Sequence, residues 1–441
     1  MYRPRRLLPT SVAVAGGCVA ALVPLRASGP DRLPGELIVA FRGGTEQGEV
    51  ERALGRSGAV RAERGLSGRR YRVTLDPSAS VEGAVRELAS LPEVEYAEPN
   101  GYVYLTQAST FRPNDRLYGI QWNLRILGAE RMWAIQKGSP SVGVAVLDSG
   151  VAYEDYVDPR TGQAFRKAPD WGATTFLPGF DFVNSDSHPN DDHYHGTHVA
   201  SAIAEATNNG EGLAGIAFNC PIMPVKVVAA NGVGNFFALA EGIDYAAGFS
   251  QGGSRPVKVI NMSLGADQAS SAAVETAVSR AVANGIVLVA SAGNDNNPRL
   301  LFPASIPSVV AVGALDQRKQ RARYSNYARG ILYAPGGDLF RDDDRDGVAD
   351  GIFQQTLSPE LAQQGRYDVF QYRGFNGTSA AAPHVAALAA LLISQGITDP
   401  RAVRVALEST AEDLGAPGDD EVYGKGLIRP VEALTGMGLN R

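Results

Sequence analysis

Three polar residues stand where the chain is expected to change from one element to the next. Asp148 follows the apolar run 142–147, His195 opens an apolar stretch, and Ser379 begins an alanine-rich one. Each residue alone has an ordinary structural interpretation, since aspartate and serine often cap helices or form turns. In the order Asp, His, Ser they could carry out acyl transfer, because a histidine takes the proton of a serine and a carboxylate orients the histidine.

A cluster of histidines surrounds the middle member of this set. His188, His193, His195 and His198 lie within eleven residues. Such a cluster could hold zinc, which makes a zinc hydrolase one alternative. Neither cysteine ligands nor the spacing of two histidines and a glutamate found in zinc proteases accompanies it. A general base at the start of a helix is therefore the preferred interpretation of His195.

The elements that must position these residues alternate between two patterns. Short, almost continuous apolar runs are typical of strands buried on both faces, and we expect such strands at 142–147, 222–228, 257–262, 286–290 and 309–313. Helical patterns fall between or after them, at 199–206, 236–249, 272–283, 380–394 and 401–410. This alternation predicts an α/β fold: a doubly wound, mostly parallel sheet flanked by helices, with its active site at the carboxyl ends of the strands.

A smaller unit is expected ahead of this domain. Residues 33–104 alternate strand patterns (36–41, 70–75, 94–99) with helical ones (47–55, 81–91), which predicts a ferredoxin-like α+β domain. Residues 105–114 are polar and are interpreted as a linker, leaving 115–441 for the larger domain. Residues 1–30 combine arginines with an uncharged run and predict an export signal. A retained membrane anchor, or lipid attachment at Cys18, is the alternative for that segment.

Composition restricts the remaining possibilities. The 441 residues are 44% hydrophobic and 20% charged, as in globular proteins. A net charge of −6 argues against a nucleic-acid partner. Cys18 and Cys220 are the two cysteines, too few for a disulfide framework, and Cys220 is expected to be a buried, inert thiol.

Three motifs resemble those of the subtilisin-like serine proteases. They are Val146-Leu147-Asp148-Ser149-Gly150, His195-Gly196-Thr197-His198-Val199-Ala200 and Gly377-Thr378-Ser379-Ala380-Ala381-Ala382-Pro383. The resemblance covers about residue 115 to the C-terminus, and residues 33–104 resemble the inhibitory propeptide of that family. Pro383 is expected near the first turn of its helix, where a missing N–H is tolerated.

This resemblance implies a role for each matching residue. Ser379 would be the nucleophile, His195 the general base and then acid, and Asp148 its orienting partner. Asn294 would donate to the oxyanion together with the main-chain N–H of Ser379. Two further segments would bind an extended peptide by main-chain pairing, with plain turns as the alternative: Gly232-Val233-Gly234 and Ser263-Leu264-Gly265.

An acidic loop predicts a calcium site. Asp342, Asp344, Asp346 and Asp350 occupy positions 1, 3, 5 and 9 of a loop whose sixth residue is glycine. Position 12 is Phe353 instead of glutamate, so the loop departs from an EF-hand, and a solvated acidic turn is the alternative. The segment 207–210 resembles a second calcium loop of the family. Calcium would stabilise the folded state of an exported enzyme that lacks disulfides.

The sequence therefore predicts a secreted serine endopeptidase that is made as a zymogen. Its substrates would be polypeptides, its propeptide an intramolecular inhibitor removed by cleavage within about 105–114, and the enzyme a monomer. Attachment to the cell envelope stays open. The alternatives are a protease fold that binds without cutting and the zinc hydrolase. The polar stretch 153–170 receives no role from the sequence.

Overall fold

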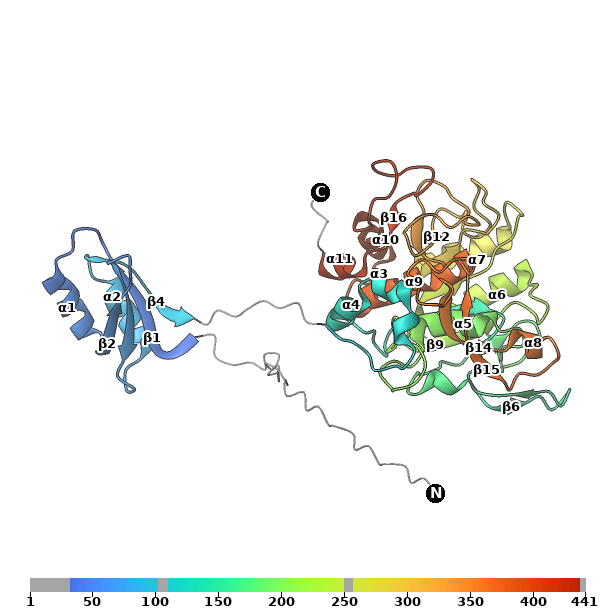
Figure 1. The fold of residues 1–441 in the computed structure, drawn as a ribbon, viewed down its shortest axis with the longest axis horizontal. Coiled ribbons are helices and arrows are strands. Elements are labelled where there is room, and N and C mark those ends of the chain that lie inside the picture. The colour runs from blue at the N-terminus through green and yellow to red at the C-terminus, as the bar shows by residue number, and fades with distance from the viewer. Residues whose placement is uncertain (1–31, 102–109, 250–256, 437–441) are drawn as a thin grey trace, which may run out of the picture. The chain divides into compact units, whose positions relative to one another are not determined.

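The computed structural model describes residues 32–101, 110–249 and 257–436 (Figure 1). The chain divides into two compact units, one within residues 1–107 and the other within 108–441. The predicted export signal at 1–30, with Cys18, lies outside the described residues, as do residues 105–109 of the predicted linker. Among the described residues, no helix is both long and apolar enough to cross a membrane.

The first unit is an antiparallel sheet with two helices. Its elements are β1 (Arg32–Phe41), α1 (Gln47–Arg56), β2 (Ala59–Arg64), β3 (Arg70–Leu75), α2 (Val81–Ala89) and β4 (Val94–Gly101). The strand order β2-β3-β1-β4 in a βαββαβ chain is that of the ferredoxin-like fold, so the predicted class is confirmed. Strand β2 was not predicted, because four of its six side chains are exposed and its residues form no apolar pattern.

The second unit is built on an eight-stranded parallel sheet. In spatial order its strands are β16 (Gly426–Leu427), β13 (Leu332–Pro335), β12 (Val310–Leu315), β11 (Val287–Ser291), β10 (Val257–Met262), β5 (Gly143–Asp148), β9 (Ile222–Lys226) and β8 (Phe180–Asp181). Every residue of β5, β9, β11, β12 and β13 is buried, which explains their unbroken apolar runs. The predicted doubly wound sheet is confirmed.

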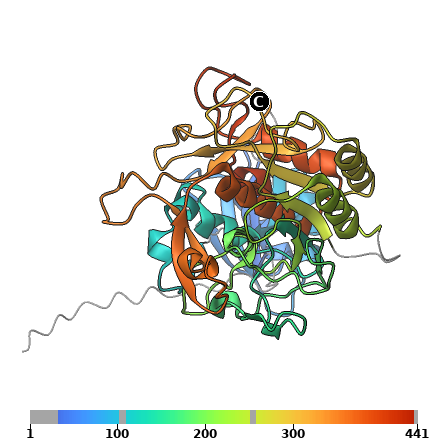
Figure 2. The ribbon, with the colours of Figure 1, turned by 90° about the vertical axis from the view of Figure 1, so that its right-hand side faces the viewer.

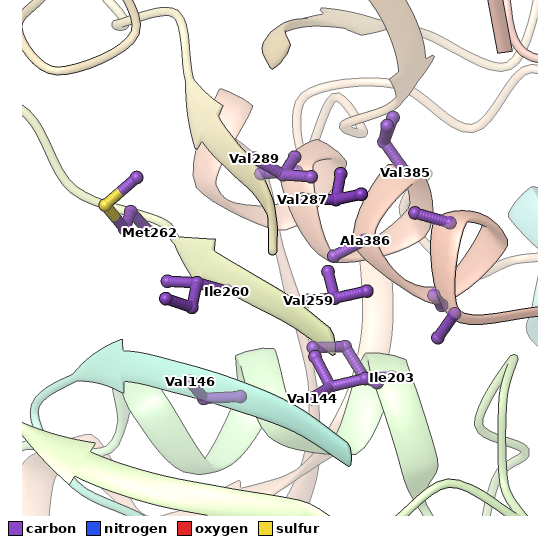
Figure 3. Packing of buried hydrophobic residues seen from close by; sticks show 14 of the residues in the cluster. Val144, Val146, Ile203, Val259, Ile260, Met262, Val287, Val289, Val385 and Ala386 are labelled. Carbon is purple, nitrogen blue, oxygen red and sulfur yellow. The ribbon is translucent and has the colours of Figure 1, made fainter. Parts of the chain in front are cut away.

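Helices cover both faces of this sheet. On one face α6 (Phe236–Ala246) packs beside α7 (Ala272–Ala283), and on the other α5 (His195–Ala204) packs beside α9 (Thr378–Ser394) (Figure 2). Figure 3 shows Val144 and Val259, on neighbouring strands, together with Ile203 of α5 and Ala386 of α9 in one buried cluster. The sheet, α5 and α9 thus share one buried core, and the candidate site is built on these elements.

The remaining elements lie around this core. They are α3 (Trp122–Ile126), α4 (Ala129–Ile135), β6 (Tyr156–Val157), β7 (Ala164–Phe165), β14 (Ile352–Leu357), α8 (Pro359–Ala362), β15 (Phe370–Phe375), α10 (Pro400–Ser409) and α11 (Pro430–Thr435), with short 3₁₀ turns at Tyr118–Ile120 and Pro169–Trp171. Strands β14 and β15 pair as an antiparallel hairpin, orange in Figure 2, that packs beside α5.

The position of Pro383 corrects one expectation. Because α9 begins at Thr378, Pro383 is its sixth residue and lies in the second turn, beyond the first turn in which a missing N–H has no consequence. A main-chain carbonyl inside the helix therefore loses its usual donor.

Candidate active site

Four candidate residues occupy the carboxyl edge of the sheet. Asp148 is the last residue of β5, and Asn294 follows β11 by three residues. His195 and Ser379 are the first and second residues of α5 and α9. Since parallel strands present their carboxyl ends at one edge, the fold brings these distant positions to the same side of the sheet.

The histidine and the aspartate form a close pair. His195 Nδ1 donates to Asp148 Oδ1 at 2.8 Å, and the Ser149 N–H donates to the same oxygen at 2.8 Å. Burial by itself lowers the pKa of His195, but the neighbouring carboxylate of Asp148 outweighs it and raises this pKa overall. The side chain of Asp148 is 3% exposed and that of His195 24%. The imidazole is thus oriented from its buried side and open on the other.

Asp191, which was not selected from the sequence, fixes the start of α5. Asp191 Oδ1 accepts hydrogen bonds from Ser149 Oγ at 2.8 Å and from the main-chain N–H of His193 at 2.9 Å. Its Oδ2 accepts from the main chain and the hydroxyl of Thr197 at 2.9 and 2.6 Å. Asp191 therefore links the turn after Asp148 to the first turn of α5, which carries His195.

Gly196 allows these two segments to approach. A Cβ at this position would lie 2.1 Å from the carbonyl oxygen of Gly150 and 3.2 Å from Asp148 Oδ1. No side chain fits there without displacing main chain. A glycine between His195 and Thr197 is thus required because α5 lies so close to the end of β5.

Asn294 and Ser379 share a small space at the start of α9. Asn294 Oδ1 accepts from the N–H of Thr378 at 2.8 Å and from its hydroxyl at 3.0 Å. A Cβ at Gly377 would lie 3.1 Å from Ser379 Oγ and 3.6 Å from Asn294 Nδ2. The side-chain amide of Asn294 is therefore fixed through its oxygen by Thr378. Its nitrogen and the hydroxyl of Ser379 both lie close to the position that a Cβ of residue 377 would occupy.

The two predicted peptide-binding segments line one pocket. Its volume is about 380 Å³, and it is lined by Val227, Val228, Gly232, Gly234, Asn235, Phe236, Leu239, Leu264, Gly265, Ala266, Gln268 and Phe302. Val233 is not part of the lining and is 62% exposed. The hydroxyl of Ser263 instead donates to the main-chain oxygen of Ser379 at 2.8 Å.

The four clustered histidines do not converge on one point. His188 Nδ1 donates to Glu154 at 2.9 Å, and His195 faces Asp148 as described. His198 donates to a main-chain carbonyl of β14 at 2.8 Å, and burial lowers its pKa to about 3. The ring of His193 stacks on that of Tyr194 with centroids 4.1 Å apart, and these four histidines do not bring three ligand atoms together at one metal position.

The acidic loop does bring carboxylates together. Ligand oxygens of Asp342, Asp344 and Asp350 lie within 4.8 Å of one another. Within the described parts of the chain, this is the one group of three or more potential metal ligands. Burial and the neighbouring carboxylates raise the pKa of Asp350. Asp346, the fourth predicted ligand, lies outside the group, and its carboxylate accepts from the N–H of Val348 at 2.8 Å.

The segment 207–210 also meets acidic side chains that the sequence did not indicate. Asp115 accepts from the N–H of Asn208 at 2.7 Å, and Asp170 accepts from the side chain of Asn209 at 2.7 Å. One oxygen each of Asp115 and Glu205 is buried with no hydrogen-bond partner. These acids are 35 or more positions apart from one another, so no local spacing could have revealed the cluster.

The stretch 153–170 packs against the residues that precede His195. Glu154 accepts the bond from His188, and the ring of Tyr156 stacks on His188 with centroids 3.8 Å apart. Arg160 donates to Asp186 at 2.9 Å. This stretch, which received no role from the sequence, thus packs against the segment that leads to His195.

The parallel sheet with Asp, His and Ser at its carboxyl edge defines an α/β serine hydrolase. Residues 139–426 match the subtilase family, and residues 25–100 match the fervidolysin N-terminal prodomain. The chain therefore belongs to the subtilase family and is a subtilisin-like serine endopeptidase with an N-terminal prodomain.

Individual relatives agree with this assignment. The chain is 35% identical to the thermophilic serine proteinase of Bacillus sp. (strain AK1), over 89% of this chain and 85% of that protein. It is 32% identical to thermitase of Thermoactinomyces vulgaris, over 74% and 99%. A solved structure of a protease from Pseudoalteromonas arctica PAMC 21717 superposes with a TM-score of 0.63 at 32% identity, covering 74% of this chain and 99% of the other.

Proposed function

We propose that Asp148, His195 and Ser379 form the catalytic triad of this endopeptidase. The observation that carries the proposal is the 2.8 Å bond between Asp148 and His195, at the sheet edge where α9 also presents Ser379. The partly exposed imidazole is free to accept a proton on its Nε2 side. Labelling with a fluorophosphonate probe tests the nucleophile: label on the mature wild type and none on Ser379→Ala supports it, whereas equal label on both contradicts it.

The chemistry follows from these positions. Ser379 Oγ attacks the peptide carbonyl carbon while His195 takes the proton of the serine hydroxyl. The carbonyl oxygen becomes negatively charged and accepts hydrogen bonds from Asn294 Nδ2 and the Ser379 N–H. His195 then protonates the leaving amine, and the C–N bond breaks to give an acyl-enzyme. A water, deprotonated by His195, hydrolyses the ester and restores Ser379.

The pocket supports an apolar preference in the substrate. The segments Gly232–Gly234 and Ser263–Gly265 are proposed to pair with an extended peptide through their main chains. Phe236, Leu239 and Phe302 give the adjacent pocket an apolar lining. A library of internally quenched peptides should show a preference for a large apolar side chain at one position, and Leu239→Asp should abolish that preference. An unchanged profile would contradict this assignment of the pocket.

We propose that the N-terminal unit keeps the enzyme inactive until it is removed. The proposed organisation is signal 1–30, inhibitory propeptide 33–104, linker with the processing site 105–114 and catalytic domain 115–441. Full-length Ser379→Ala should remain uncut in intact-mass analysis while the wild type loses residues 33–104. Full activity with these residues attached would exclude inhibition.

The destination and the partners are proposals of the same kind. Export is supported by the arginines and uncharged run within residues 1–30 and by a relative, 31% identical, from Xanthomonas campestris pv. campestris that is named an extracellular protease. We expect a secreted monomer with polypeptide substrates and no nucleic-acid partner. Fractionation of culture medium, membranes and cells separates a secreted enzyme from one attached to the envelope, and light scattering gives its oligomeric state.

Calcium is the proposed structural cofactor. Oxygens on opposite sides of a calcium ion at about 2.4 Å are about 4.8 Å apart, so the oxygens of Asp342, Asp344 and Asp350 fit one ion. The pKa of Asp350 is raised by burial first and then by the neighbouring carboxylates, and a cation would offset that repulsion. The second proposed position is the loop 207–210 with Asp115, whose unpartnered buried oxygen is a suitable ligand.

Calcium affinity can be measured without the reaction. Isothermal titration of the metal-free Ser379→Ala protein should give saturable binding, and Asp350→Asn and Asp115→Asn should each remove one class of site. Magnesium is the matched control, because it demands shorter bonds and stricter geometry. Titration curves unaltered by both substitutions would contradict these ligand assignments.

A further inference from the structure

The main-chain carbonyl of Ser379 lacks the donor that an α-helix normally supplies. In an α-helix the N–H of residue 383 would donate to this carbonyl. Residue 383 is proline, which has no N–H to give. The carbonyl that loses its donor thus belongs to the proposed nucleophile itself.

Ser263 supplies the missing hydrogen bond. Its hydroxyl donates to Ser379 O at 2.8 Å and in turn accepts from Asn261 Nδ2 at 3.0 Å. Asn261 is fully buried and Ser263 is 5% exposed. A chain of two hydrogen bonds therefore runs from the carboxyl end of β10 to the main chain of the nucleophile.

The next carbonyl of α9 is also held by a side chain. His384 Nδ1 donates to the oxygen of Ala380 at 2.9 Å, and its Nε2 accepts from Asn123 at 2.9 Å. Burial lowers the pKa of His384 to about 4, so the imidazole is neutral and can both donate and accept. Side-chain hydrogen bonds from Ser263 and His384 thus hold the first carbonyls of α9, in addition to the main-chain bonds of the helix.

We propose that Ser263 is a positioning residue that sets the orientation of Ser379. The inference rests on the proposed function, in which Ser379 is both the nucleophile and an oxyanion donor. Rotation of the main chain at this residue would move its hydroxyl and its N–H together, and sub-ångström errors of this kind reduce rate more than binding. The neighbouring Leu264 and Gly265 line the pocket, so one segment contacts the substrate and aligns the nucleophile.

A double-mutant cycle tests the inference. Ser263→Ala, Pro383→Ala and the double variant are compared as mature enzymes whose active sites are counted by fluorophosphonate titration. Ser263→Ala should lower kcat about five- to tenfold with KM changed less than about twofold, because a buried carbonyl loses its partner. In the Pro383→Ala background the new N–H can donate to Ser379, and Ser263→Ala should lower kcat less than about twofold.

Several results would overturn the proposal. Equal loss in both backgrounds would show that Ser263 acts independently of this carbonyl, and a loss confined to KM would make it a binding residue. Ser263→Thr keeps the hydroxyl and should retain most of kcat; a loss as large as that of Ser263→Ala would also exclude the role. If Ser263→Ala does not mature, the cycle is run with Ser263→Cys in its place and Ser263→Thr as the reference. The cysteine thiol is a weak donor, so Ser263→Cys should lower kcat when residue 383 is proline and not in the Pro383→Ala background. Absence of label on the wild type would instead contradict the proposed function as a whole.

Discussion

Asn294→Ala isolates the contribution of one proposed oxyanion donor. The side chain of Asn294 is exposed, so its removal leaves no buried cavity. Its oxygen is anchored twice by Thr378, at 2.8 and 3.0 Å, which means that the amide nitrogen is held in place before the substrate arrives. A preorganised donor of this kind contributes about 3 to 4 kcal/mol to transition-state stabilisation, and its loss should lower kcat about 10² to 10³-fold.

The assay separates this effect from damage to the fold. Steady-state kinetics on a chromogenic peptide should give an almost unchanged KM, and thermal unfolding should show only the loss of about 1 to 2 kcal/mol expected when the N–H and hydroxyl of Thr378 lose their acceptor. Thr378→Val is the matched control, because it removes one anchor of Asn294 and leaves the donor itself; about a five- to tenfold loss of kcat is expected. If Asn294→Ala keeps kcat within about threefold of the wild type, or loses activity through KM alone, the assignment of the donor is wrong.

Three further substitutions test other parts of the site. Asp148→Asn should lower kcat about 10⁴-fold. The carboxylate of Asp148 raises the pKa of His195, which must be neutral to act as a base, so wild-type activity should fall as the pH drops through that raised pKa. A pH profile of kcat/KM should show the acid limb of the variant at lower pH than that of the wild type. Gly377→Ala should slow fluorophosphonate labelling while leaving the protein folded by circular dichroism, since the added methyl would lie 3.1 Å from Ser379 Oγ and the serine side chain must shift; an unchanged labelling rate would contradict this reasoning. Asp350→Asn should lower the unfolding midpoint in calcium but not in a chelator, and an equal shift in both would show a role independent of the ion.

The sequence was most informative where burial was complete. Strands such as β5 and β12 are buried along their whole length, so their apolar runs could be recognised as strands from the sequence. The edge strand β16 has two residues, and β14 buries the polar residues Gln354, Gln355 and Thr356 between its two buried apolar ends, Ile352 and Leu357. Neither produces an apolar period, which is why these elements were not predicted.

The same distinction applies to the site. Residues carried by a motif at an element boundary could be selected, whereas Asp191 acts through contacts with Ser149 and Thr197 that only the fold creates. The unexpected position of Pro383 has a similar origin. Its local sequence is compatible with a helix start, and the first helical residue is fixed by the contacts of Thr378 with Asn294.

The parallel sheet also determines when during folding this chain can begin to cut. Asp148 and Ser379 are 231 positions apart (379 − 148), and none of the neighbouring strands that carry the site can pair through a short hairpin. Closing such long loops is slow, and the site is complete only when the last of them has closed. A partly folded chain would therefore hold a serine and a histidine without a functioning nucleophile, so newly made copies would not digest one another while they are still most open to attack.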